Sequence, residues 1–200
     1  MFRIERAGLA DMAGIYRVCL LSADAGGDAT ALYPDPDLPG HVYAGPYLAQ
    51  GGGTQLVVVD DEGVAGYVLS ADDTAAFAAW AEEQWWPTLR ERYPRTDDDT
   101  PTGHIVRLIH EPDRPSPDLL ADYPAHFHID LLERTRGAGL GRKLLERLFE
   151  ELRERGVSGL HMGVDGRNTN AIGFYEHLGF RTLEREPWGV TMGMRLREGR

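Results

Sequence analysis

The sequence predicts a mixed α/β fold built as one domain over residues 1–200. Three observations predict it: a strand followed by a helix at the start, two β-rich runs joined by a tight turn, and a later strand that leads through a glycine-rich loop into an amphipathic helix. A chain of this length buries roughly 70% of its unfolded surface around one core, so a single domain is the expected organisation.

The first elements follow from alternation and helical spacing. Phe2–Arg6 alternates apolar and charged residues and is expected to be a strand. Asp11 is expected to cap a helix with apolar residues at helical spacing: Met12, Ile15, Tyr16, Cys19 and Leu20. Residues 22–53 form a long connection rich in glycine and proline, with room for a short helix at its end. Its tyrosines (Tyr33, Tyr43 and Tyr47) favour an ordered, packed loop.

The next segment contains a hairpin and a helix. Gln55–Val59 and Val64–Ser70 are β-rich and should pair antiparallel, because the residues between them suit a hairpin turn. A helix is expected from Asp73 or Thr74 to about Trp86, with a second short helix up to Tyr93. Three tryptophans of this segment are expected in the core: Trp80, Trp85 and Trp86.

The middle and the end of the chain complete the alternation of strands and helices. His104–Ile109 is predicted as a short strand, and the proline-rich run Glu111–Pro124 as an irregular connection. We expect residues 22–53 and 87–124 to be loops or insertions between the core strands and helices. Ala125–Leu132 should be a strand, and a helix should begin at Leu140 and end before Gly156. The remaining predicted elements are the strand Gly159–Val164, the helix Asn168–Leu178, and the strands Phe180–Glu184 and Val190–Leu196.

Composition and charge exclude several classes of partner. The chain carries 21 basic and 32 acidic residues, a net charge of -11, which argues against a nucleic-acid partner. No apolar run approaches the ~20 residues that cross a bilayer, so no membrane association is expected. Cys19 is the single cysteine, which rules out an internal disulfide and favours the reducing cytoplasm as the expected location. The N-terminus does not look like a secretory signal.

The negative charge is unevenly distributed. Residues 1–100 contain 6 basic and 17 acidic residues, a net charge of -11, whereas residues 101–200 contain 15 of each. Such a field favours a cationic ligand near the first half of the chain. A solvated acidic surface that aids solubility explains the same asymmetry.

The glycine-rich loop is a candidate anion site. A strand leads through Arg136, Gly137, Ala138, Gly139 and Gly141 into the helix that begins at Leu140. A helix N-terminus presents free N–H groups and the positive end of its dipole, and glycine lets a pyrophosphate approach the backbone. Arg142 and Lys143 would add positive charge. A tight turn without a ligand remains the alternative.

A second motif lies about thirty residues later. Asn168 and Tyr175 are seven residues apart, so a helix would place both side chains on one face, about 10 Å apart. Both could then lie along one extended cofactor. The alternative is that Asn168 caps the helix and Tyr175 is a half-buried core aromatic.

Together the two motifs resemble a known family. Arg136-x-x-Gly139-x-Gly141, followed by Asn168-x-x-Ala171-Ile172-x-x-Tyr175-x-x-x-Gly179-Phe180, resembles the acetyl-CoA signatures of the GNAT family of N-acetyltransferases. A narrower likeness is to the acetyltransferase-like C-terminal domain of eukaryotic O-GlcNAcase and its free-standing bacterial relatives. It rests on dispersed motifs: Tyr33–Leu38, Tyr47-Leu48, Gly66-Tyr67, Trp86-Pro87 and His126–Asp130. Glu133 stands where the family often has proline.

The resemblance implies a fold, a co-substrate and residue roles. The sheet would splay where Ala125–Leu132 and Gly159–Val164 run parallel, and acetyl-CoA would transfer its acetyl group directly to a primary amine on a small molecule or peptide. Backbone groups of Leu131 and Leu132 would hold the acetyl end, the loop from Arg136 to Arg142 the pyrophosphate, and Asn168 and Ile172 the pantetheine arm. Tyr175 would donate a proton to the departing sulfur.

Deprotonation of the amine requires a base, because an amine with a pKa near ~10.4 is almost entirely charged at pH 7. Strand alternation puts His126, His128 and Asp130 on one face. We expect Asp130 to be the base, with His128 second and Asp165 third; a buried structural network and a metal site are the alternative explanations. The acceptor would enter near four aromatic residues of the acidic half: Tyr33, Tyr43, Tyr47 and Trp85.

Two other functions remain compatible with these motifs. One is a catalytically inactive module that binds acetyl-CoA and interacts with a partner. The other is an enzyme that uses a longer acyl-CoA or a hydroxyl acceptor, because a glycine loop recognises only phosphate. The sequence carries no signature of the oligomeric state.

Overall fold

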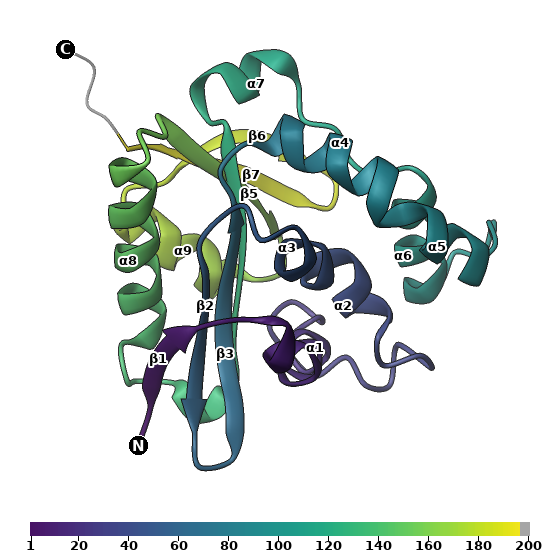
Figure 1. Ribbon diagram of the computed structural model, residues 1–200, viewed down its shortest axis with the longest axis horizontal. Coiled ribbons are helices and arrows are strands. Elements are labelled where there is room, and N and C mark those ends of the chain that lie inside the picture. The colour runs from purple at the N-terminus through teal and green to yellow at the C-terminus, as the bar shows by residue number, and fades with distance from the viewer. Residues whose placement is uncertain (197–200) are drawn as a thin grey trace.

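A computed structural model of the chain describes residues 1–196. Seven strands form one sheet in the order β1-β2-β3-β4-β5-β7-β6, with helices on both faces (Figure 1). The strands are β1 (Arg3–Arg6), β2 (Gln55–Asp60), β3 (Gly63–Ala71), β4 (Ala125–Leu131), β5 (Gly159–Asp165), β6 (Arg181–Glu186) and β7 (Gly189–Arg195). The predicted mixed α/β fold is confirmed, and so is the antiparallel hairpin of β2 and β3.

The strand pairing changes from antiparallel to parallel at the centre of the sheet. β3 and β4 pair antiparallel over six residues, from Gly66↔Leu131 to Ala71↔His126. β4 and β5 run parallel but pair only at Ala125↔Leu160 and His126↔His161, while β5 continues to pair with β7 along its whole length. Beyond His126 the two central strands therefore separate, which confirms the expected splay of the sheet.

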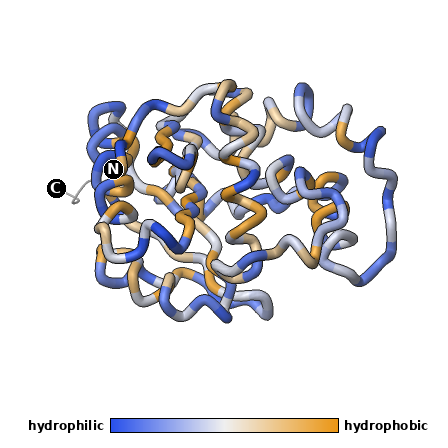
Figure 2. The backbone as a smooth tube through the Cα atoms, turned by 90° about the horizontal axis from the view of Figure 1, so that it is seen from below, coloured by the Kyte–Doolittle hydropathy of each residue, from blue (hydrophilic) through white to orange (hydrophobic). Residues whose placement is uncertain are grey.

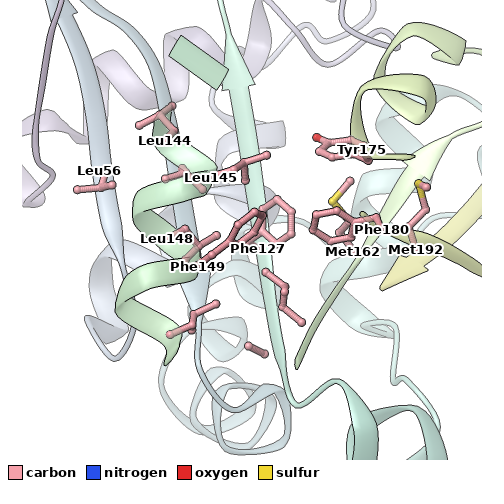
Figure 3. Packing of buried hydrophobic residues seen from close by; sticks show 14 of the residues in the cluster. Leu56, Phe127, Leu144, Leu145, Leu148, Phe149, Met162, Tyr175, Phe180 and Met192 are labelled. Carbon is pink, nitrogen blue, oxygen red and sulfur yellow. The ribbon is translucent and has the colours of Figure 1, made fainter. Parts of the chain in front are cut away.

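One face of the sheet is covered by α8 (Leu140–Glu154) and α9 (Thr169–His177) (Figure 1). The apolar stripe of α8 packs on the strands through Leu144, Leu145 and Leu148, which are 0% exposed. Figure 3 shows these leucines beside Phe127 of β4. Burial of one such leucine stabilises the fold by about 1.5–3 kcal/mol, so the predicted amphipathic helix forms the main core contact.

The opposite face is covered by α1 (Met12–Leu20), α2 (Leu38–Tyr43) and α3 (Gly45–Gln50), the last two within the long connection 22–53. As expected, tyrosines pack this connection: Tyr33 is 8% and Tyr47 is 3% exposed. One expected cap is wrong. Asp11 accepts from the Gly8 N–H at 2.9 Å and so stabilises the 3-10 turn η1 (Leu9–Asp11), not the first turn of α1.

A helical insertion joins β3 to β4. It comprises α4 (Thr74–Gln84), α5 (Trp86–Arg92), α6 (Pro101–His110) and α7 (Pro117–Asp122). The predicted strand His104–Ile109 is wrong: this segment is part of α6. Thr100 accepts from the Gly103 N–H at 3.2 Å as a helix cap and Pro101 occupies the first turn, and both favour a helix over the strand that the β-branched residues suggest.

The insertion has a core of its own. Ile105, Val106 and Ile109 form one buried face of α6, together with Trp86 and Leu89 of α5. Trp86 is buried as expected, and Trp80 and Trp85 pack on the same cluster while partly exposed. The segment 111–124, expected to be irregular, contains α7, which Ser116 caps through the Leu119 N–H.

Hydropathy follows this layering. In Figure 2 the hydrophobic parts of the chain lie mainly inside the molecule, and the outer loops are mostly hydrophilic. Among the helices of residues 1–196, none has the length and apolar character needed to cross a membrane.

Candidate active site

The separation of β4 from β5 leaves backbone groups of β4 directed into the gap. The Leu132 N–H donates to the Ala65 carbonyl of β3 at 2.9 Å, and the Leu132 carbonyl accepts from the Thr135 N–H at 2.9 Å. The expectation that backbone groups of Leu132 hold the acetyl end is therefore wrong, because both groups already have partners. Because alternate residues of a strand point their N–H and C=O groups to opposite sides, the groups of Ile129 and Leu131 point away from β3. They face the side on which β5 has moved away, where an extended ligand can pair as an added strand.

The glycine-rich loop lies at the open end of this gap. It follows the 3-10 turn η2 (Glu133–Thr135) and contains Gly137 and Gly139, with φ of 79° and 68°. Left-handed conformations of this kind favour glycine. An added Cβ at either position would meet nothing within 4 Å, whereas one at Gly141 would lie 3.2 Å from Leu131. The start of α8 is therefore seated against the end of β4.

The first turn of α8 has the properties of an anion site. Gly139 is its N-cap and supplies no side-chain acceptor, and no acidic residue lies in the first turn. The first N–H groups of a helix have no partner within the helix, and here they open onto the exposed loop with Arg142 and Lys143 beside them. This donor set and the open space at the glycines fit the pyrophosphate of a coenzyme A thioester.

Asn168 caps α9, as one of the two interpretations of the sequence predicts. Its Oδ1 accepts from the Ala171 N–H at 3.1 Å. Its amide nitrogen lies against Gly26, where an added Cβ would be 3.1 Å away. The neighbouring Arg167 pairs with Asp24 at 2.9 Å, so the segment that follows α1 packs on the start of α9. Ile172 is half-buried and packs on the core beside α8.

Tyr175 projects from α9 towards the same gap. It is 7% exposed, and its ring lies 6.5 Å from that of Phe127 on β4. Figure 3 shows its hydroxyl pointing from α9 towards β4. Burial and the nearby charge of Asp130 raise the pKa of Tyr175 well above its usual value, so the phenol keeps its proton. Tyr175 is thus a core aromatic, as one of the two interpretations of the sequence predicts, and its contact with a cofactor stays a prediction.

Asp130 lies on the other face of β4, near the end of the strand. The Tyr67 hydroxyl of β3 donates to its Oδ2. Burial raises the pKa of Asp130 to about 6, against the opposing effect of the hydrogen bond from Tyr67. A carboxylate with this pKa is ionised at pH 7 and close to the range in which it can accept and release a proton.

The two histidines on this face differ. His126 Nδ1 lies 2.8 Å from Thr74 Oγ1, whose proton goes to the Pro124 carbonyl, so His126 is the donor and has a structural role. Burial lowers the pKa of His128 to about 4, and its ring packs 5.4 Å from those of Tyr43 and Tyr47. Within the described part of the chain, no three His, Cys, Asp or Glu side chains are grouped to hold a metal ion.

Asp165, the third candidate base, has a strong partner. Its carboxylate pairs with the Arg167 guanidinium at 2.8 Å, and this contact lowers the pKa of Asp165. A carboxylate held in an ion pair is a weaker base than Asp130. The roles of these residues and of the loop residues stay predictions.

The four aromatic residues predicted near the acceptor divide into two groups. Tyr43 lies against His128, and burial raises the pKa of Tyr33, with a smaller effect from the charge of Asp24. Tyr47 is instead stacked on Phe77 at 4.5 Å, and Trp85 donates from its indole nitrogen to the His41 carbonyl. A contact of Tyr33 or Tyr43 with an acceptor stays a prediction.

Sequence reasoning missed the residues that surround Asp130 from other elements. Tyr67 contacts the carboxyl from β3, and Ser22 lies beside it at the end of α1. A tyrosine in an otherwise aliphatic buried strand was the available signal. Its partner follows only from the register of two strands that are more than sixty residues apart in the sequence.

Comparison with known proteins agrees with this geometry. A family model described as the acetyltransferase (GNAT) family matches residues 28–180. The O-GlcNAcase of Rattus norvegicus is 24% identical over 173 residues, which are 84% of this chain and 19% of that protein. The [ribosomal protein bS18]-alanine N-acetyltransferase of Escherichia coli K12 is 47% identical over 77 residues, 38% of this chain and 52% of that protein. The chain thus spans a fifth to half of these relatives.

Solved structures give the same result. A crystal structure of SsHAT matches with a TM-score of 0.89 and 34% identity, covering 98% of this chain and 99% of that one. The acetyltransferase yncA of Salmonella typhimurium, solved with acetyl-CoA, matches with a TM-score of 0.60 and 21% identity over 100% of this chain and 96% of that one. The chain therefore belongs to the GNAT acetyltransferase family, a family of acyltransferases that use acetyl-CoA.

Proposed function

We propose that the protein is an N-acetyltransferase that moves an acetyl group from acetyl-CoA directly to a primary amine. The observation that supports the proposal is that β4, which carries Asp130 near its end, leads through the glycine-rich loop into the first turn of α8 and lies beside Tyr175 of α9. Acetyl-CoA supplies the acetyl thioester. The α8 N–H groups would bind its pyrophosphate, and Ile129 and Leu131 would pair with the pantetheine arm.

Asp130 and Tyr175 would divide the proton transfers. Asp130 would accept a proton from the acceptor ammonium, directly or through water, because an amine with a pKa near ~10.4 is neutral in only about one molecule in 10^3.4 at pH 7, a cost of about 4.6 kcal/mol. As the amine nitrogen bonds to the acetyl carbon and the carbon–sulfur bond breaks, Tyr175 would donate its phenolic proton to the departing sulfur. The second proton that the nitrogen loses on becoming an amide would pass through water to Tyr175 and restore the phenol, while Asp130 returns its proton to solvent. The raised pKa of Tyr175 keeps that proton available at neutral pH.

The acceptor we propose is cationic before it reacts. The segment that follows α1 comes from the acidic half of the chain, packs on the start of α9 and carries Asp24 and Asp28, and Tyr33 and Tyr43 would offer aromatic faces to an ammonium group. A small-molecule amine and a peptide amine share this chemistry. The relatives include an enzyme named for the alanine of a ribosomal protein and a mycothiol acetyltransferase from Beutenbergia cavernae, so both kinds of amine belong in the test.

The test has a binding step and a turnover step. Calorimetric titration with acetyl-CoA should show saturable binding, and coenzyme A release should then be measured with lysine peptides, alanine N-terminal peptides, amino sugars and small diamines. Asp130→Asn should abolish release while binding persists, and Asp165→Asn, the matched control, should retain most turnover. An absence of binding at millimolar acetyl-CoA would overturn the proposal. Binding without turnover on any amine would favour an interaction module.

A further inference from the structure

Asp130 has a fixed partner that the proposed reaction does not use. Register places Tyr67 directly opposite Asp130 on β3, and the Tyr67 hydroxyl donates to Oδ2 of the carboxylate. Tyr67 is 0% exposed, so the packing around it fixes the ring. The hydroxyl is therefore held in one place while the end of β4 borders the gap.

Among the described groups that face Asp130, Tyr67 is the one that donates a hydrogen bond to the carboxylate. Ser22 lies close to the carboxyl, but its hydroxyl donates to the Val18 carbonyl at 2.8 Å. Burial raises the pKa of Cys19, so this neighbour of the Tyr67 hydroxyl on α1 is an uncharged thiol. His128 on the same strand and Tyr175 on α9 are also neutral at pH 7. The hydrogen bond that opposes the effect of burial on the pKa of Asp130 therefore comes from Tyr67.

We propose that Tyr67 is a positioning residue for the transfer: its hydroxyl holds Oδ2 of Asp130, so that Oδ1 is the oxygen that meets the acceptor amine. The inference rests on the proposed role of Asp130 as the base. Rotation of a carboxylate about its last bond is broad and nearly unrestricted by itself. A buried donor on one oxygen selects a single orientation before any substrate arrives.

The same contact opposes the effect of burial on the charge of Asp130. Burial disfavours the ionised carboxylate, and the Tyr67 hydrogen bond favours it. Without the Tyr67 hydroxyl, burial acts unopposed and the pKa of Asp130 should rise. A hydrogen bond to a charged group corresponds to a shift of about 1–2 pH units in the titration of that group.

The experiment is a titration of Asp130 that needs no acceptor. Aspartate side chains are isotope-labelled at the carboxyl carbon, and the Asp130 resonance is assigned by its absence in Asp130→Asn. In the wild type it should titrate near pH 6, and in Tyr67→Phe about 1–2 units higher. Tyr47→Phe is the matched control: it removes a hydroxyl from a tyrosine in the same buried cluster, next to His126 and His128, and should leave the titration unchanged.

A second substitution guards against a folding defect in Tyr67→Phe. A ring-fluorinated tyrosine at position 67 keeps the shape but donates more strongly, so Asp130 should titrate below the wild type. An unchanged titration of Asp130 in both Tyr67 proteins would overturn the inference. Full turnover by Asp130→Asn would instead overturn the proposed base, so the two failures are distinguishable.

Discussion

Replacing Asp130 with asparagine should make the protein more stable while it removes activity. The carboxyl is nearly isosteric with a carboxamide, and the Asn oxygen can still accept from the Tyr67 hydroxyl. In the folded chain, the pKa of Asp130 is raised from 3.8 to about 6. The folded state therefore binds the proton more tightly than the unfolded state, and the ionised carboxylate lowers stability at neutral pH.

The magnitude follows from the size of the shift. The pKa difference costs the wild type about 3 kcal/mol at pH 7, about 1.5 kcal/mol at pH 5 and about 0.5 kcal/mol at pH 4. Burial of the unpaired NH₂ group of the asparagine costs about 1 kcal/mol, which reduces the gain in the free energy of unfolding. Asp130→Asn should thus gain about 2 kcal/mol at pH 7, or roughly 4–8 °C in Tm for a chain of this size. The gain should fall to about 0.5 kcal/mol at pH 5, vanish near about pH 4.5 and become a loss of about 0.5 kcal/mol at pH 4.

Urea unfolding followed by tryptophan fluorescence across this pH range provides the assay. The matched control is Asp60→Asn, because Asp60 is held by the Arg134 guanidinium at 2.7 Å, which lowers the pKa of Asp60. This control should lose stability at pH 7, the opposite sign. An Asp130→Asn protein that is destabilised at pH 7, or a gain that does not shrink as the pH falls, would refute the reasoning.

Three further outcomes are expected. Tyr175→Phe should lower the turnover number and leave the acetyl-CoA dissociation constant unchanged, and steady-state kinetics with unaltered turnover would contradict its role as the acid. Gly139→Ala forces a side chain into a left-handed conformation at φ 68°, which costs about 1–2 kcal/mol; calorimetry should show weaker acetyl-CoA binding, whereas Gly173→Ala, with open space at its Cβ, should bind normally. Because burial lowers the pKa of His128 from 6.5 to about 4, its contribution to stability is complete above about pH 6.5 and falls by about 2 kcal/mol at pH 5; His128→Phe should remove this loss in urea titrations, and an equal loss would count against the assignment.

The parts of the site that depend on local sequence were predictable. The glycines before α8 and the spacing of Asn168 and Tyr175 belong to single continuous segments, so residue type and helical period indicate where their side chains lie. The polar face of β4 followed in the same way from strand alternation. The Tyr67–Asp130 contact was not predictable, because it depends on the register of β3 against β4 across the whole helical insertion.

The wrong prediction within the insertion has a physical cause. Ile105, Val106 and Ile109 favour a strand by intrinsic preference, and a six-residue window around them contains no helical period long enough to decide. The outcome depends on packing against α5 and on the cap at Thr100. Tertiary contacts outweigh a preference worth only a few tenths of a kcal/mol per residue.

The two residue pairs that join β4 to β5, Ala125↔Leu160 and His126↔His161, fix the closed end of the gap at the proposed active site. The imidazole rings of His126 and His161 lie 5.8 Å apart at this junction, and each is anchored, to Thr74 and to the Tyr123 carbonyl at 2.8 Å. The angle between the two strands is therefore set at the closed end, four residues from Asp130. We therefore expect a substitution at either histidine to change this angle, and with it the separation of β4 from β5 beside Asp130, from a position several residues away.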